Sequence, residues 1–326
     1  MQSLQFELWQ ECNSLCKYCY LGTDNRKTPD DIKLNSLRNT IEKISDLSLY
    51  QGERPVEVLS YLGGEFFQGQ LNTPEIKNEF FNLMKKTAEL FNSQTIKQVW
   101  IYATMTLGDQ KDLYDTLDLF DMTKGTFWLL TSYDTIGRFH NQKMFDNWDY
   151  HMRNIHEKYP LIEFNTTTII TQDIINKYLS GMFSFKEFMN KYHTAMFFKQ
   201  CGTGNMTKEF LQSRMNNLFF PKRNDMIKFF MKFHEEEGPE LYDKLFNIYY
   251  RADDLYRNYN NISESMKLIH RDKTSKNEEQ MVDGEISKLS CGHLINYMAY
   301  SDCNECVMCD KLKVKKIMEA KQHAKK

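Results

Sequence analysis

Three cysteines near the start of the chain, Cys12, Cys16 and Cys19, are separated by three and then by two residues. Thiolates at this spacing can hold three irons of a cubic iron–sulfur cluster, whose sites are normally filled by four cysteines. The fourth iron would then lack a protein ligand, so a small molecule could coordinate it and be reduced there. A zinc knuckle or an unligated loop is the alternative. Zinc normally takes four ligands, however, and no fourth cysteine or histidine lies nearby in the sequence.

A second group of cysteines lies near the other end of the chain, at Cys291, Cys303, Cys306 and Cys309. Four thiolates suffice to saturate a metal site, and the two-residue spacings of the last three are typical of ferredoxin-type clusters. Structural zinc and a loose cysteine tail are the competing interpretations. The eighth cysteine, Cys201, stands alone, and a buried structural role is favoured over a catalytic or cluster role.

Two further sets of residues follow predicted strands. Gly63, Gly64 and Glu65 come directly after the apolar run of residues 56–62. Glycines let the backbone approach a ligand closely, and a carboxylate at that place can pair with an ammonium group. Ser132 and Asp134 come at the end of the apolar run of residues 126–132. Ordinary polar turns are the alternative interpretation of both sets.

The elements that must position these residues alternate between strand and helix. We predict strands at residues 2–9, 56–62, 99–103, 126–132, 162–169 and 194–199. We predict helices at residues 32–47, 74–91, 111–120, 146–158 and 172–192, the last broken near Gly181. Such alternation predicts an α/β fold with a parallel sheet and helices outside it.

Six strand–helix units fall short of the eight of a full TIM barrel. A curved, partial (β/α)6 TIM-like barrel is therefore the favoured prediction, with a flat sheet as the alternative. In either case functional residues gather at the carboxyl ends of the strands, where both sets of polar residues and the first cysteine group are expected. We assign residues 1–204 to this domain, 205–285 to a helical segment, and 286–326 to a small cysteine-rich metal-binding region with a basic tail.

Composition limits the classes of partner and the compartment. The formal net charge of −2 over 326 residues gives no general electrostatic reason to expect a nucleic-acid or membrane partner. No signal peptide and no apolar run long enough to span a bilayer are present, so we expect a cytoplasmic protein. In such a reducing compartment, clustered cysteines indicate metal ligands rather than disulfides.

The first cysteine array, with Tyr18 just before Cys19, resembles the signature of the radical S-adenosylmethionine (radical SAM) superfamily. The Gly-Gly-Glu sequence after the second strand is similar to the family's turn that binds the methionine amino group of SAM. The family often has a proline next, whereas this chain has Phe66. The resemblance covers roughly residues 1–200.

The resemblance implies a 4Fe-4S cluster on the three cysteines and SAM as the ligand of its open iron. It implies that Ser132 approaches the ribose of SAM and that Tyr18 neighbours its adenine. The cofactor-binding residues implied by the resemblance are Tyr18, Gly63, Gly64, Glu65, Ser132 and Asp134. Reduction of SAM would yield a 5′-deoxyadenosyl radical that abstracts hydrogen from a substrate, with flavodoxin or ferredoxin as the kind of electron donor. The sequence identifies no catalytic acid, base or radical relay.

The C-terminal cysteines resemble the start of the SPASM and twitch auxiliary-cluster domains of peptide-modifying radical SAM enzymes, the branch of the anaerobic sulfatase maturases. This resemblance implies a second 4Fe-4S cluster, with zinc as the alternative, and a peptide or protein side chain as substrate. A nucleotide or nucleic-acid base is the alternative substrate. A non-catalytic iron–sulfur or zinc protein is the alternative outside enzymes.

Overall fold

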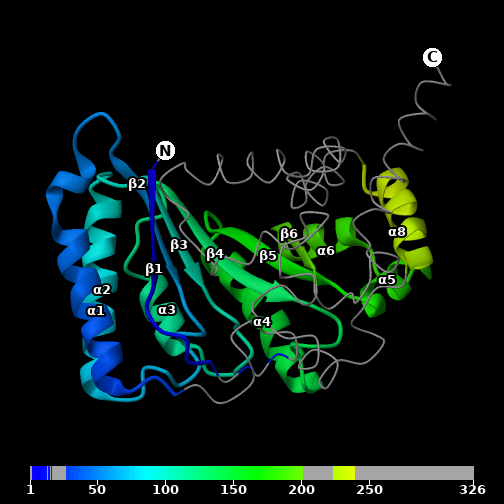
Figure 1. The fold of residues 1–326 in the computed structure, drawn as a ribbon, viewed down its shortest axis with the longest axis horizontal. Coiled ribbons are helices and arrows are strands. Elements are labelled where there is room, and N and C mark those ends of the chain that lie inside the picture. The colour runs from blue at the N-terminus through cyan, green and yellow to red at the C-terminus, as the bar shows by residue number, and fades with distance from the viewer. Residues whose placement is uncertain (1, 13, 15, 17–26, 201–222, 239–326) are drawn as a thin grey trace, which may run out of the picture. The chain divides into compact units, whose positions relative to one another are not determined.

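The computed structural model of the chain describes residues 2–12, 14, 16, 27–200 and 223–238. Its strands are β1 (Gln2–Glu7), β2 (Val56–Leu62), β3 (Gln98–Tyr102), β4 (Thr126–Tyr133), β5 (Glu163–Ile170) and β6 (Thr194–Gln200). Its helices are α1 (Asp30–Ser45), the 3-10 helix η1 (Leu47–Tyr50), α2 (Pro74–Asn92), α3 (Lys111–Leu117), α4 (Gln142–Lys158), α5 (Gln172–Leu179), α6 (Phe185–Tyr192) and α8 (Arg223–Glu236). Figure 1 shows strands and helices alternating along the chain.

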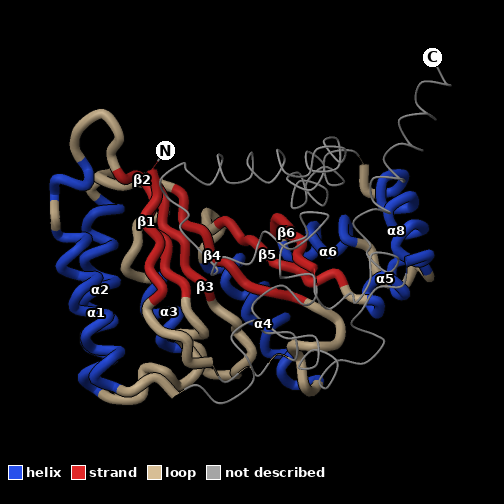
Figure 2. Tube along the Cα trace, in the orientation of Figure 1, coloured by secondary structure: helices blue, strands red, loops and turns tan. Residues whose placement is uncertain are grey.

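The strands form a single parallel sheet with the sequential order β1-β2-β3-β4-β5-β6 (Figure 2). β1 pairs in register with β2 from Ser3 opposite Val58 to Glu7 opposite Leu62, and β4 pairs with β5 as far as Tyr133 opposite Thr168. Sequential order of parallel strands requires a crossover between each pair, and helices supply these crossovers. The prediction of an α/β fold with a parallel sheet is confirmed.

The described residues divide into two compact units. The first takes its described residues from Met1–Cys16, Leu21–Thr168 and Glu187–Met196, and the second from Ile169–Lys186 and from Phe197 onwards. The contacts that are described below for the candidate site join residues of the first unit. The structure describes one helix, α8, in the stretch 205–285, and the cysteine-rich region 286–326 lies outside the described residues.

One face of the sheet in the first unit is buried beneath helices. The Tyr61 hydroxyl on β2 shares a 2.6 Å hydrogen bond with Thr87 of α2, and Trp148 of α4 donates to Thr131 of β4 at 3.1 Å. Side chains of a strand alternate between faces, so Trp100 and Trp128 lie on the opposite face, with ring centroids 6.0 Å apart. The fully buried apolar residues of the helix-covered face include Leu59, Val99, Ile101, Phe127 and Leu129.

The helices α2 and α4 each begin after a residue whose side chain caps them. Thr73 accepts a hydrogen bond from the Ile76 N–H, with Pro74 in the first turn of α2, as the sequence predicts. The predicted start of the next long helix near residue 146 is wrong, because α4 begins at Gln142. Asn141 caps it, since its side-chain oxygen accepts the Met144 N–H at 3.0 Å.

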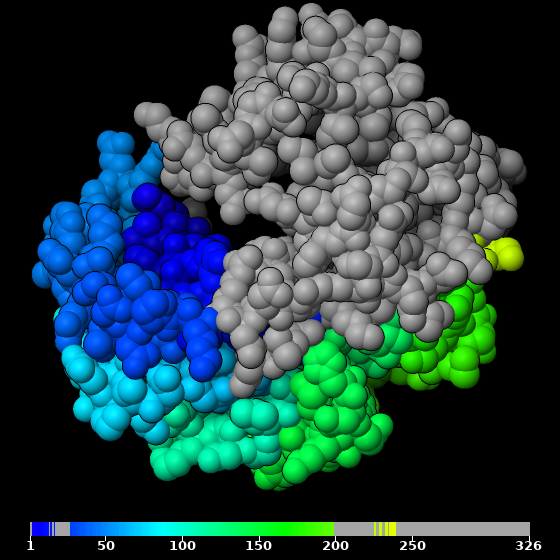
Figure 3. All heavy atoms as spheres, turned by 60° about the horizontal axis from the view of Figure 1, so that its bottom comes forward, coloured from blue at the N-terminus to red at the C-terminus, as the bar shows by residue number. Residues whose placement is uncertain are grey.

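The two N-terminal helices, α1 and α2, lie side by side (Figure 1). In the space-filling view of Figure 3, the blue and cyan atoms of this N-terminal part of the chain adjoin one another. Arg38 of α1 donates to Glu75 at 3.0 Å and to Glu79 at 3.1 Å, both on α2. These groups are largely exposed, so water and salt screen the pairs and each contributes little to stability.

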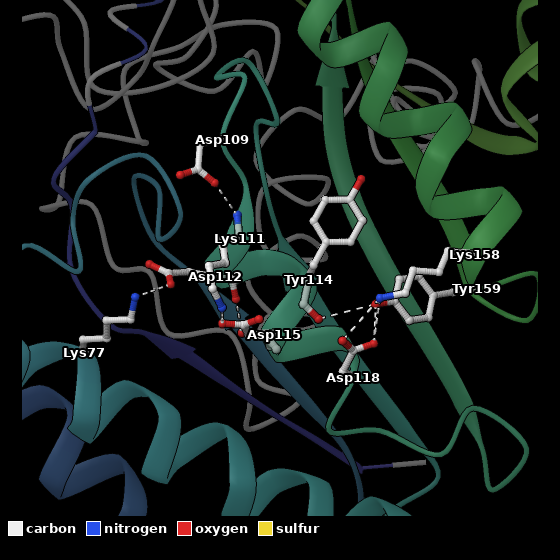
Figure 4. A network of polar contacts seen from close by, with 10 residues as sticks. Lys77, Asp109, Lys111, Asp112, Tyr114, Asp115, Asp118, Lys158 and Tyr159 are labelled. Atoms are coloured by element: carbon white, nitrogen blue, oxygen red, sulfur yellow. Dashed lines mark hydrogen bonds and ion pairs between the residues drawn. The ribbon is translucent and has the colours of Figure 1, made fainter.

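Polar contacts hold α3 beside its neighbours (Figure 4). Asp112 of α3 pairs with Lys77 of α2, and the Asp118 carboxylate at the end of α3 accepts from Lys158 of α4 at 3.1 Å. Tyr159 also donates to Asp118. The helix that follows β3 is therefore fixed to the helices on both sides of it.

The C-terminal turn of α6 is fixed to α4 by Asp149. The Asp149 carboxylate accepts from the Tyr192 hydroxyl at 2.6 Å and from Lys191 at 2.9 Å. Burial works to raise the pKa of Asp149, but these hydrogen bonds outweigh it and lower the pKa to about 2. The carboxylate is therefore charged at every physiological pH.

The second unit has an aromatic core. Tyr178 of α5 meets Phe229 of α8 edge-on at 5.3 Å, and Phe185 meets Phe233 at 5.2 Å. Glu237 then accepts the Phe185 N–H at 3.2 Å at the start of α6. In the part of the chain that the structure describes, every helix is too short or too polar to span a bilayer.

Candidate functional site

The first cysteine group begins just beyond the carboxyl end of β1. Cys12 is half-buried and Cys16 is buried, with 6% of its surface exposed. Both lie at the sheet edge where the predicted strand order places them. Cys19 and Tyr18 lie outside the described residues, as do Cys201, Cys291, Cys303, Cys306 and Cys309.

The turn formed by residues 63–65, here called the GGE turn, contacts the chain that leads into Cys12. The Gly64 N–H donates to Trp9 O at 2.9 Å and the Glu65 N–H donates to Glu11 O at 3.0 Å. These bonds continue the β1–β2 pairing beyond the ends of both strands. Two sequence motifs that are some fifty residues apart therefore form one continuous backbone structure.

The close approach explains both glycines. A Cβ at Gly63 would lie 2.5 Å from Trp9 O, and one at Gly64 would overlap the carbonyl oxygens of Gln10 and Glu11. Backbone atoms cannot move aside as a flexible side chain can. The sequence predicts that these glycines let the backbone approach a ligand, and the structure shows that they let the turn approach the backbone before Cys12.

Glu65 joins the ends of three strands. Its side-chain Oε1 accepts the N–H groups of Phe66 at 2.8 Å and Phe67 at 2.9 Å, and Oε2 accepts the Thr104 N–H at 2.6 Å. Its backbone oxygen accepts the Trp9 indole N–H at 2.8 Å. Glu65 is only 3% exposed, so these donors replace the water that a charged carboxylate would otherwise need.

Ser14, between Cys12 and Cys16, is held from two sides. Its hydroxyl donates to Gln68 Oε1 at 3.3 Å, and Gln68 in turn donates to Thr104 and Thr106 beyond β3. The His140 ring Nε2 lies 2.7 Å from Ser14 O and, as the donor to that carbonyl, carries the proton. Sequence reasoning missed Gln68, because a glutamine three residues after a motif carries no signal of its own.

Cys12 shares an electrostatic environment with Glu65 and Arg138. Burial raises the pKa of the Cys12 thiol, and the Glu65 charge acts in the same direction. Hydrogen bonds from Ser14 and the charge of Arg138 oppose the rise without cancelling it. A metal ion bound at Cys12 would therefore have to displace a proton, as metals do at thiolate sites generally.

Asp134 shapes the loop that follows β4. Its buried Oδ1 accepts the N–H groups of Ile136 at 3.0 Å and Arg138 at 3.1 Å, together with that of Gly137. Ser132 lies near the end of β4, half-exposed, opposite Thr167 of β5. It faces away from the helix-covered side to which neighbouring Thr131 points. The structure thus places both predicted residues at the same sheet edge as Cys12.

Within the described residues, no three side chains of histidine, cysteine, aspartate or glutamate converge on a common point. Only two of the three cysteines of the first group belong to that part of the chain. The chain matches no protein-family model, and no curated protein sequence matches it.

Proposed function

We propose that the protein is a radical SAM enzyme. The observation that carries the proposal is the direct bonding of the GGE turn to residues 9–11, which lead into Cys12. This bonding supports the assignment of the two motifs, which resemble the superfamily separately in the sequence, to one site. Alternation of six parallel strands with helices supports the finer proposal of a partial (β/α)6 barrel.

The residues fit a cluster with three cysteine ligands. Thiolates are the ordinary ligands of iron–sulfur clusters, and half-burial at Cys12 together with burial at Cys16 limits access of water. When bound, the cluster would supply the electron that cleaves SAM to methionine and a 5′-deoxyadenosyl radical. The protein binds and orients the reactants and keeps water away.

The GGE turn is the proposed binding place for the methionine end of SAM. Both carboxylate oxygens of Glu65 already accept backbone N–H groups. Glu65 would therefore act on a ligand ammonium as a fixed negative charge rather than as a movable hydrogen-bond partner. Ser132 is proposed for the ribose and Tyr18 for the neighbourhood of the adenine. Asp134 would act by fixing the backbone of its own loop.

The C-terminal cysteines, Cys291, Cys303, Cys306 and Cys309, are proposed to hold a second 4Fe-4S cluster or zinc. We propose a peptide or protein side chain as substrate and a flavodoxin or ferredoxin as electron donor. A nucleotide or nucleic-acid base is the second candidate substrate, and a non-catalytic metal protein is the candidate outside enzymes.

Anaerobic reconstitution followed by metal analysis tests the proposal. We expect the wild-type protein to bind iron and sulfide and to release 5′-deoxyadenosine from SAM when dithionite is added. Cys16→Ala should lose this release, whereas Cys201→Ala, at the cysteine outside both groups, should retain it. Release by the reconstituted Cys16→Ala variant would refute the assignment. Zinc in place of iron in the wild type would favour the non-catalytic metal protein.

A further inference from the structure

Lys33 in the first turns of α1 has a buried ammonium group. Its side chain is 1% exposed, and its Nζ lies 2.7 Å from Glu11 Oε2 and 3.2 Å from Gln70 O. The ammonium also lies 5.8 Å from the centre of the Trp9 ring. Taking a lysine charge out of water is costly unless partners replace the water, and here a carboxylate, a carbonyl and an aromatic ring do so.

Its partner Glu11 is the residue immediately before Cys12. The same Oε2 atom that meets Lys33 also accepts the Thr28 N–H at 3.1 Å. Residues 12–27, here called the cysteine segment, contain all three cysteines of the first group. One carboxylate therefore joins the residues that flank this segment on either side.

The same residue connects the segment to the GGE turn. Glu11 O accepts the Glu65 N–H at 3.0 Å, so a shift of Glu11 would disturb both motifs together. Lys33 is the cation that compensates the charge of the Glu11 carboxylate. Without this ion pair, the Glu11 side chain would be drawn towards water. Lys33 thus contacts the residue that precedes Cys12 directly, and through that residue it is linked to Thr28.

We propose that Lys33 is a positioning residue that fixes Glu11 and Thr28 beside each other and so holds Cys12, the residue next to Glu11, in the place where it binds metal. The inference rests on the proposed function only for the identity of the metal group. Residues that orient metal ligands from behind typically change metal affinity by about 10- to 100-fold when they are removed. We therefore expect an effect of at least about tenfold.

The test compares Lys33→Met with Arg38→Met. Both variants remove one cation from α1, but Arg38 pairs with Glu75 and Glu79 at the surface. Iron affinity is measured anaerobically by competition with a chelator, and the reduced cluster is examined by electron paramagnetic resonance. Lys33→Met should bind iron at least about tenfold more weakly and give an altered spectrum, while Arg38→Met should match the wild type.

Lys33→Met leaves Glu11 without its cation, so a double variant, Lys33→Met with Glu11→Gln, guards against simple failure to fold. It contains neither buried charge, and the glutamine oxygen can still accept the Thr28 N–H. We expect circular dichroism to show it folded and its iron affinity to lie between those of Lys33→Met and the wild type. Where Lys33→Met does not fold, an affinity of the double variant below the wild type supports the proposal.

The inference would be overturned if folded Lys33→Met had the iron affinity and the spectrum of the wild type. Where Lys33→Met does not fold, it would be overturned if the double variant bound iron as tightly as the wild type. Failure of the radical SAM proposal gives a different result. If the wild type binds zinc and releases no 5′-deoxyadenosine, the same competition is run with zinc. Weaker zinc binding by Lys33→Met would then still support the positioning role.

Discussion

Removal of the Glu65 carboxylate should destabilise the protein far more than removal of an exposed glutamate. In Glu65→Ala the N–H groups of Phe66, Phe67 and Thr104 lose a charged acceptor in a buried place. A hydrogen bond to a charged group contributes about 1.5–3 kcal/mol, so loss of all three would cost about 5 kcal/mol or more. Water that enters the vacated space can serve some of these donors, which reduces the expected loss to about 3–5 kcal/mol.

Urea unfolding of the apoprotein, followed by circular dichroism, measures this loss without a contribution from bound metal. Glu89→Ala is the matched control, because the Glu89 side chain is 68% exposed and pairs with Lys86 across one helical turn. It should leave the free energy of unfolding unchanged within error. Glu65→Gln keeps one acceptor oxygen and should lie between the control and Glu65→Ala.

Equal free energies of unfolding for Glu65→Ala and Glu89→Ala would refute the reasoning. They would mean that the three N–H groups find other partners and that Glu65 does not hold the strand ends together. A large loss confined to Glu65→Ala would instead show that the hydrogen bonds of Glu65 stabilise the fold before any ligand binds.

Gly64→Ala should lower the amount of iron bound per chain after reconstitution, because its Cβ would overlap Glu11 O and force the turn away from the cysteine segment. Gly108→Ala is the control, because a Cβ there meets Asn147 at ordinary contact distance. This variant should bind as much iron as the wild type. Asp149→Asn should lower the free energy of unfolding by about 2 kcal/mol at pH 7, because the pKa of Asp149 is lowered to about 2 in the folded state. The contribution of the Asp149 charge to stability is fully present above the pKa of the unfolded state, near 4, and is lost as the pH falls towards 2. Urea unfolding should therefore show a smaller difference in free energy between variant and wild type at pH 3 than at pH 7.

The parallel sheet was predictable because buried parallel strands read as apolar runs separated by helical patterns. Placement of Cys12 and the GGE turn at one edge followed from the same reasoning, since carboxyl ends of parallel strands meet. Asn141 shows where this reasoning failed. The sequence predicts this helix from residue 146, yet the Asn141 side chain caps α4, which begins at Gln142. A polar residue such as Asn141 can belong to a turn or cap a helix, and the sequence alone does not decide between the two.

Side-chain partners that are distant in sequence were not predictable. Nothing in the spacing of Glu11, Lys33 and Thr28 indicates that they meet, because their contact depends on how the chain returns from the cysteine segment to α1. Asp134 illustrates a related limit. The sequence identifies a carboxylate after a strand, but only the structure shows that it accepts backbone N–H groups of its own loop.

Phe66 stands where the superfamily that the chain resembles often has a proline, and this difference changes how the GGE turn is held. A proline at this position would lack the N–H that Phe66 donates to Glu65 Oε1 at 2.8 Å. The Phe66 ring is buried and meets the Trp9 ring edge-on at 5.2 Å, so it also packs against the chain that leads to Cys12. Proline would stiffen such a turn through its ring, whereas this chain fixes the turn by a hydrogen bond and aromatic packing. The departure at Phe66 therefore replaces one means of holding the GGE turn with another, and it leaves the turn attached to the cysteine segment.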